Sequence, residues 1–179
     1  MSPKPAQAGG PPIWFGGSHP AALHRAVAHA DGFIGAGSQT TAAFADQVKV
    51  VRVALGEAGR DPATLRIAKR VYLAIDDDRD RARRRIGEAL QRVYGYFGAP
   101  DLTPVSVTGT VDDVVAGVHQ VIDAGAQMVL LNPMFDDAEQ LDPAQQHAAF
   151  ATFVETTTRG VPLIAAERVP PVDLPLRED

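Results

Sequence analysis

Short apolar runs alternate along the chain with longer stretches of helical periodicity. The apolar runs are bounded by Gly, Pro, Asn or Asp, and the run 66–75 (RIAKRVYLAI) is the richest in β-branched and aromatic residues. Runs of this length with turn residues on both sides are typical of buried strands. The pattern predicts strands at residues 13–15, 33–34, 66–75 and 127–131.

Between these runs, hydrophobic residues recur at helical spacing. Phe44, Val48 and Val51 illustrate this, since they lie at i, i+4 and i+7 on one helical face. Thr110 followed by Asp113 resembles a capping box that starts a further helix. Ser18 is a candidate N-cap for the first helix. We predict helices at about 21–30, 40–58, 79–97, from Thr110 to about 123, and 143–158.

The resulting order, β-α-β-α-β-α-α-β-α, predicts an α/β fold with a parallel sheet and helical crossovers. Four core strands are expected. Residues 1–12 are rich in Pro, Gly and Ala and are predicted to be a linker-like lead-in. The domain is predicted to span 13–160, with a Pro-rich tail at 161–179.

Composition and charge narrow the class of protein. The chain has 179 residues, of which 45% are hydrophobic, which is enough for one core. Its net charge of −5 gives no basic field for nucleic acid or an anionic membrane. It lacks an apolar run of the roughly 18 residues that span a bilayer, and its start lacks the apolar region of a signal peptide. The chain has no cysteine, which is compatible with a reducing cytoplasm. Together these features predict a cytoplasmic domain without nucleic-acid or membrane partners.

Two glycine turns follow the first two predicted strands and precede helices. Glycine lets the backbone approach a phosphate closely, and the free N–H groups at a helix N-terminus favour an anion. The alternative is a pair of tight turns that need the φ range of glycine and bind nothing. The candidate anion-binding residues are Gly16, Gly17, Ser18, Gly35, Ala36, Gly37 and Ser38.

The predicted strand 66–75 carries polar residues on an otherwise apolar pattern. Arg70 and Tyr72 alternate with the apolar set, so they are expected on the face turned away from the helices. A buried guanidinium needs an acidic partner or an anionic ligand. The alternative is a structural arginine with a carboxylate partner beside a packed tyrosine. Lys69 falls on the helix-facing set and is predicted to be structural, with its stem along apolar surface and its amine in solvent.

Other polar clusters have simpler explanations. No metal site is predicted from the five histidines: His24 and His29 are five residues apart, about 140° around one predicted helix, and the other three have no carboxylate at ligand spacing. Residues 76–78 are acidic and precede a helix, where capping and the helix dipole explain them. The basic run 79–85 is interpreted as a solvated helix face.

Several stretches in order resemble one known family. They are PPIWFGGSHPAALHRAVAHADGFIGAG from residue 11, KRVYLAIDDDRDRAR from residue 69 and GTVDDVVAGVHQVIDAGAQMVLLNP from residue 109. Over residues 3–160 the chain resembles the C-terminal half of the luciferase-like flavin- or F420-dependent oxidoreductases, which share a TIM-type (β/α)8 barrel. The resemblance implies that the four predicted strands are strands five to eight of such a barrel, whose closure typically takes about 250 residues.

The resemblance also implies a function and a site. It predicts an oxidoreductase that binds FMN or F420 and transfers hydride to or from a small organic substrate, or activates O2 if it is a monooxygenase. In alkanesulfonate monooxygenases the matching strand reads Arg-x-His and contributes to the active site, which implies catalytic positions at Arg70 and Tyr72. Asn132 ends the last predicted strand on the active-site side of such a barrel. The alternative interpretation of Asn132 is that it forms a turn with the proline that follows it.

A half barrel would expose two sheet edges and an open inner face. We therefore expect a homodimer, or a partner that completes the barrel. The alternative functions are a non-catalytic half-barrel or assembly module, and the product of a truncated gene.

Overall fold

Every strand pair in the described part of the sheet is parallel. The computed structural model describes residues 9–98, 100–133 and 163–165. The strands are β1 (Trp14–Gly16), β2 (Gly32–Gly35), β3 (Arg66–Ile75), β4 (Val107–Gly109), β5 (Met128–Pro133) and β6 (Leu163–Ala165). Their order is β1-β2-β3-β5-β6, and β4 also pairs with β3. Since Leu73 is paired with both Val107 and Pro133, β4 and β5 lie on opposite edges of β3.

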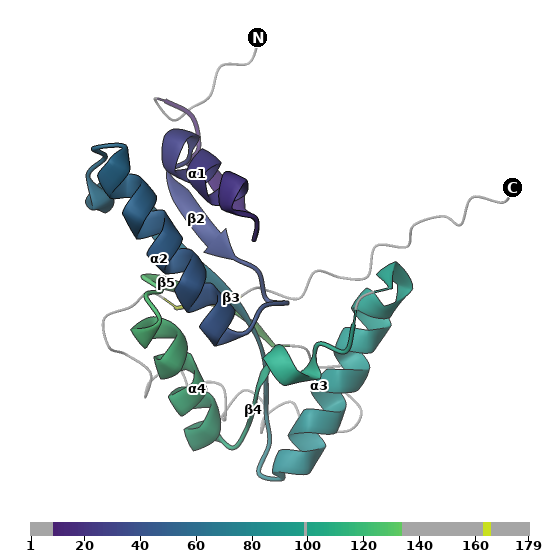
Figure 1. Ribbon diagram of the computed structural model, residues 1–179. Coiled ribbons are helices and arrows are strands. Elements are labelled where there is room, and N and C mark those ends of the chain that lie inside the picture. Colours follow the sequence, from purple (N-terminus) through teal and green to yellow (C-terminus); the bar gives the residue numbers. More distant parts are fainter. Residues whose placement is uncertain (1–8, 99, 134–162, 166–179) are drawn as a thin grey trace, which may run out of the picture.

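Within the described residues, four helices connect the strands from β1 to β5. They are α1 (Pro20–His29), α2 (Thr41–Glu57), α3 (Arg79–Tyr94) and α4 (Val111–Asp123), with short 3-10 turns at 62–64, 95–97 and 103–105. Figure 1 shows α1, α2 and α4 on one side of the sheet and α3 on the other side of β3. The predicted parallel sheet with helical crossovers is confirmed.

Alternation along β3 divides the core in two. Ile67, Val71 and Leu73 face the large cluster that α1, α2 and α4 form with β2 and β5. Tyr72 and Ala74 face the other way, into a smaller cluster with α3. Successive side chains of a strand point to opposite faces, so the sequence pattern places Arg70 and Tyr72 on the side away from the large cluster.

The helix starts follow from local hydrogen bonds. Thr110 and Asp113 form the predicted capping box, in which the Thr110 N–H donates to Asp113 Oδ2 at 2.9 Å. The first helix differs from the prediction. Its N-cap is His19, whose Nδ1 accepts from the Ala21 N–H at 3.2 Å, and Ser18 lies one residue outside.

The strand count and some boundaries also differ from the prediction. Six strands are described where four core strands were expected, because β4 and β6 have three residues each and are too short to show a periodicity. The strand β6 falls within the expected tail 161–179, and β5 continues through Asn132 and Pro133, which were expected to end it. Pro133 is the last residue of β5. The predicted helix 143–158 lies outside the described residues.

Candidate functional site

The carboxyl ends of the parallel strands bring the predicted site residues to one end of the sheet. Gly16, the last residue of β1, pairs with Ile34 near the end of β2. Further across the sheet, Tyr72 of β3 pairs with Asn132 of β5. Residues paired directly across parallel strands lie on the same face. The structure thus brings Arg70, Tyr72 and Asn132 to one face, and the second glycine loop lies against Arg70 and Tyr72.

The first glycine loop is a tight turn. Gly17 has φ +137°, and a Cβ there would lie 2.8 Å from the Cβ of Ala22, so only glycine fits without strain. Gly16 has ordinary room, since its nearest neighbour would be the Ile34 carbonyl oxygen at 3.5 Å. Ser18 is exposed. The shape of this loop agrees with both sequence interpretations, anion loop and simple turn.

The second glycine loop crosses the end of the sheet. A Cβ on Gly35 would lie 2.5 Å from Cδ2 of Phe44 and 3.0 Å from Cδ of Lys69, so Gly35 serves close packing on the helix-covered side. A Cβ on Gly37 would instead lie 2.6 Å from Cε2 of Tyr72 and 3.2 Å from Nε of Arg70. Gly37 therefore brings bare backbone against the two predicted catalytic side chains.

Arg70 is half-buried and stacks on its neighbour, with its guanidinium carbon 5.3 Å from the ring centroid of Tyr72. No carboxylate among residues 9–98 and 100–133 forms an ion pair with it. Cation–π contact compensates part of the charge. The lack of a carboxylate partner in this part of the chain favours the anionic-ligand interpretation of Arg70.

Tyr94 is a site residue that the sequence interpretation missed. The Tyr72 hydroxyl donates to the Tyr94 hydroxyl oxygen at 2.9 Å, and the two ring centroids are 5.7 Å apart. Burial first, and then this hydrogen bond, raise the pKa of Tyr72 well above its ordinary value, so the phenol stays protonated. A signal was present, because Tyr94 continues the spacing of Ile86 and Leu90 at four-residue intervals.

Lys69 differs from its sequence interpretation. Its side chain was expected to reach solvent, but the residue is 2% exposed. Its Nζ donates to the carbonyl oxygen of Ala36 and, at 3.1 Å, to that of Gln39, and lies 5.9 Å from the ring centroid of Phe44. Burial, with a smaller effect from the charge of Arg70, lowers the pKa of Lys69 to about 8. The amine therefore binds carbonyl oxygens of the loop backbone and does not reach solvent.

The basic run 79–85 is also less solvated than expected. Arg81 and the buried Arg85 both pair with the buried carboxylate of Asp76, at 2.7 Å and 3.3 Å. Burial alone would raise the pKa of Asp76, but the Arg81 hydrogen bonds and the two positive charges hold it below its ordinary value. These pairs fix the N-terminal part of α3 to the end of β3. The expected capping role in this segment is confirmed for Asp78, which accepts from two N–H groups of α3.

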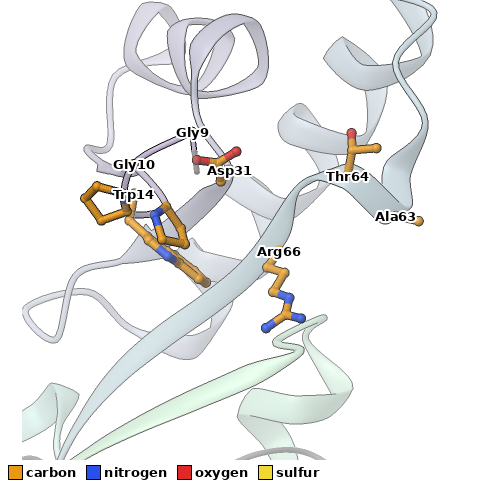
Figure 2. Close-up of a pocket in the computed structure, with 9 residues that line it drawn as sticks. Gly9, Gly10, Trp14, Asp31, Ala63, Thr64 and Arg66 are labelled. Atoms are coloured by element: carbon orange, nitrogen blue, oxygen red, sulfur yellow. The ribbon is translucent and has the colours of Figure 1, made fainter. Parts of the chain in front are cut away.

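A separate hollow of about 510 Å³ lies at the opposite end of the sheet. Figure 2 shows Trp14, Asp31 and Arg66 around it, and these residues lie at or just before the starts of β1, β2 and β3. In parallel β/α folds function concentrates at the carboxyl ends of the strands, whereas the amino ends serve stability. This hollow is therefore not the predicted site.

The described residues contain no group of three His, Cys, Asp or Glu side chains placed to hold a metal ion. No helix in the described part of the chain is long and apolar enough to cross a bilayer.

The sequence profile of the luciferase-like monooxygenases matches residues 1–158. The chain belongs to this family. No curated protein matches it by sequence.

Solved structures of luciferase-like enzymes share the fold. A monooxygenase from Streptomyces bottropensis aligns with a TM-score of 0.65 and 18% identity, covering 87% of this chain and 51% of its own. An F420-dependent secondary alcohol dehydrogenase, solved with an F420-acetone adduct, aligns with a TM-score of 0.64 and 16% identity, covering 82% of this chain and 48% of its own. A third structure is the oxygenating constituent of the 3,6-diketocamphane monooxygenase of Pseudomonas putida, solved with FMN. It aligns with a TM-score of 0.57 and 19% identity, covering 87% of this chain and 50% of its own.

This luciferase-like chain spans about half the length of these structures. Its described sheet corresponds to part of their TIM-type barrels, in agreement with the half-barrel expectation.

Proposed function

We propose that this luciferase-like chain binds the phosphate-bearing end of FMN or F420 at the loops 16–18 and 35–38, as part of an oxidoreductase acting on a small organic substrate. The observation that carries the proposal is the contact of Gly37 with Arg70 and Tyr72. It places bare backbone, an unneutralised guanidinium and a hydroxyl pair at the carboxyl end of the sheet, where β/α folds bind ligands.

The residues present fit such a cofactor. The amide oxygen Oε1 of Gln39, at the end of the second loop, is buried and accepts no hydrogen bond among the described residues. A buried acceptor without a donor costs free energy, so a ligand donor here is favourable. Hydroxyl and ring N–H groups of a flavin-type cofactor are donors of this kind. Arg70 would meet the anionic part.

The chain's own groups have distinct roles in this proposal. When bound, the cofactor supplies the redox chemistry, hydride transfer or, in a monooxygenase, reduction of O2. Arg70 would bind and orient negative charge, and Asn132, paired with Tyr72 in the sheet, would orient the substrate. Tyr72 stays protonated, so it donates a hydrogen bond and does not act as a base.

One observation favours a second candidate. The chain covers only 42% to 53% of the solved luciferase-like structures it resembles. A half barrel could keep the phosphate loops yet lack the groups that complete a catalytic site. The alternative is therefore a non-catalytic half-barrel or assembly module of the family.

The same open geometry supports a proposal about assembly. Trp14, Ile34, Met128 and Leu130 lie on the face away from the large core cluster and are only half-buried among the described residues. Half-buried apolar residues beside an open sheet edge favour association. We propose that a second copy of the chain covers this face.

A cofactor titration tests the function. Gly37→Ala would push a methyl group into the buried ring of Tyr72, so we expect it to weaken FMN or F420 affinity by about tenfold or more. Gly56→Ala is the matched control, because a Cβ there meets nothing within 4 Å on an exposed helix face. Fluorescence titration measures both. If neither cofactor binds to the wild-type chain, the cofactor proposal is wrong and the assembly-module alternative gains support.

A further inference from the structure

We propose that Lys69 is a positioning residue of the anion-binding loop 36–39, where it orients the loop's N–H groups and places a buried positive charge behind the bound phosphate. This inference rests on the proposed function, because it concerns the same loop. It assigns a role to a side chain that sequence reasoning had placed in solvent.

The geometry gives the direction. Lys69 Nζ donates to the carbonyl oxygens of Ala36 and Gln39. In a trans peptide the carbonyl and the following N–H point in opposite directions. The N–H groups of Gly37 and Thr40 are therefore turned away from the lysine. One ammonium thus fixes two peptide units of the loop with their donors outward.

The electrostatics point to an anion. Lys69 is 2% exposed, and no carboxylate pairs with it in the part of the chain that the structure describes. Among the described residues, the one charged group that acts on it is Arg70. The loop 36–39 carries no charged side chain, α2 presents the ring of Phe44, and the paired residue on β5 is Val129. A buried cation without a counter-ion is costly, and a bound phosphate would neutralise it.

A second cation strengthens the case. Arg70 follows Lys69 in β3 and points to the opposite face, where it meets Gly37 of the same loop. The loop is therefore flanked by two positive charges on opposite faces of one strand. The charge of Arg70 acts on Lys69 and, after burial, is the second cause that lowers its pKa to about 8. Phosphate binding should consequently favour the protonated amine and weaken as the pH rises through 8.

The experiment uses inorganic phosphate, FMN and F420 as separate probes. Backbone amide resonances of residues 36–40 are followed in 15N-labelled protein between pH 7 and 9.5, without ligand and with each probe. We expect the Gly37 and Thr40 amides to titrate near pH 8, and phosphate affinity to fall by about tenfold across this range. In Lys69→Met both the titration and the pH dependence should vanish. Lys49→Met is the control, since Lys49 is exposed and pairs with Asp46 on the outer surface of α2.

The outcomes separate the two proposals. Phosphate binding that depends on Lys69 without binding of FMN or F420 supports this inference and contradicts the cofactor proposal. Equal FMN affinity and pH profile in wild type and Lys69→Met overturns this inference and leaves the cofactor proposal standing. Loop amides of the wild type that do not respond to pH, or to phosphate, also overturn it, and that measurement needs no variant to fold.

Discussion

Burial of the Lys69 amine should make the stability of the chain depend on pH in a defined way. The pKa of Lys69 is about 8 in the folded chain, against 10.5 for an ordinary lysine. Between these values the unfolded chain keeps a proton that the folded chain has released. The free energy of unfolding therefore rises with pH through this window, because the unfolded state binds more protons.

The magnitude follows from the shift. Each pKa unit corresponds to 1.36 kcal/mol, so the whole shift is worth about 3 kcal/mol between pH 7 and 11. Over the narrower range from pH 7 to 9, the expected increase in the free energy of unfolding from this one group is about 1.3 kcal/mol. With a urea m-value of about 2 kcal/mol/M, the unfolding midpoint should move up by roughly 0.7 M.

Urea unfolding of wild type and Lys69→Met at several pH values isolates this contribution. Other groups titrate in the same range, but they are shared, so the difference between the two proteins reports Lys69 alone. Lys49→Met again serves as the control and should keep the wild-type pH slope, because Lys49 is exposed. Parallel curves for wild type and Lys69→Met between pH 7 and 9 would refute the assigned burial of the charged amine.

Three further outcomes are expected. Tyr94→Phe removes the acceptor of a buried tyrosine hydroxyl and should lower the free energy of unfolding by about 1 kcal/mol, while Tyr96→Phe, at a 93% exposed position, should not change it. Asp76→Asn should cost about 3 kcal/mol at pH 7, since it removes the charge that faces the buried Arg85. Because the pKa of Asp76 is lowered, this difference should shrink as the pH falls through the acid range, and the exposed Asp77→Asn is its control. Sedimentation equilibrium at micromolar concentration should give a dimer, and a strictly monomeric chain would contradict the proposed self-association.

Regular elements long enough to show a period could be predicted from the sequence. The strand 66–75 is observed with the predicted bounds, and the face of α2 that carries Phe44 and Val48 is buried as its spacing indicated. The strands β4 and β6 could not be found in this way. Three residues cannot distinguish alternation from chance, and their pairing with β3 and β5 depends on contacts far along the chain.

The candidate site shows the same division. Alternation within β3 sufficed to place Arg70 and Tyr72 on the face away from the large core cluster. It gave the wrong environment for Lys69, because the path of the loop 36–39 decides whether that amine meets water or carbonyl oxygens. Local sequence carries little information about which way a loop carbonyl turns. Sequence reasoning therefore predicted the face of each side chain better than its partners.

The phosphate end and the ring end of the proposed cofactor site depend on different parts of the protein. The elements proposed to hold a phosphate are the loops 16–18 and 35–39 with Lys69 and Arg70, and all of them lie within the described residues, at or after β1 and β2 and on β3. In the proposed function the ring and substrate end would lie over the half-buried apolar face of the sheet, and this chain spans about half the length of the solved luciferase-like structures. Affinity for phosphate should therefore be a property of the chain itself, while turnover should depend on what covers that face. If turnover appears only at concentrations where the chain is dimeric, and phosphate affinity stays constant over the same range, the two ends of the site are separable as argued.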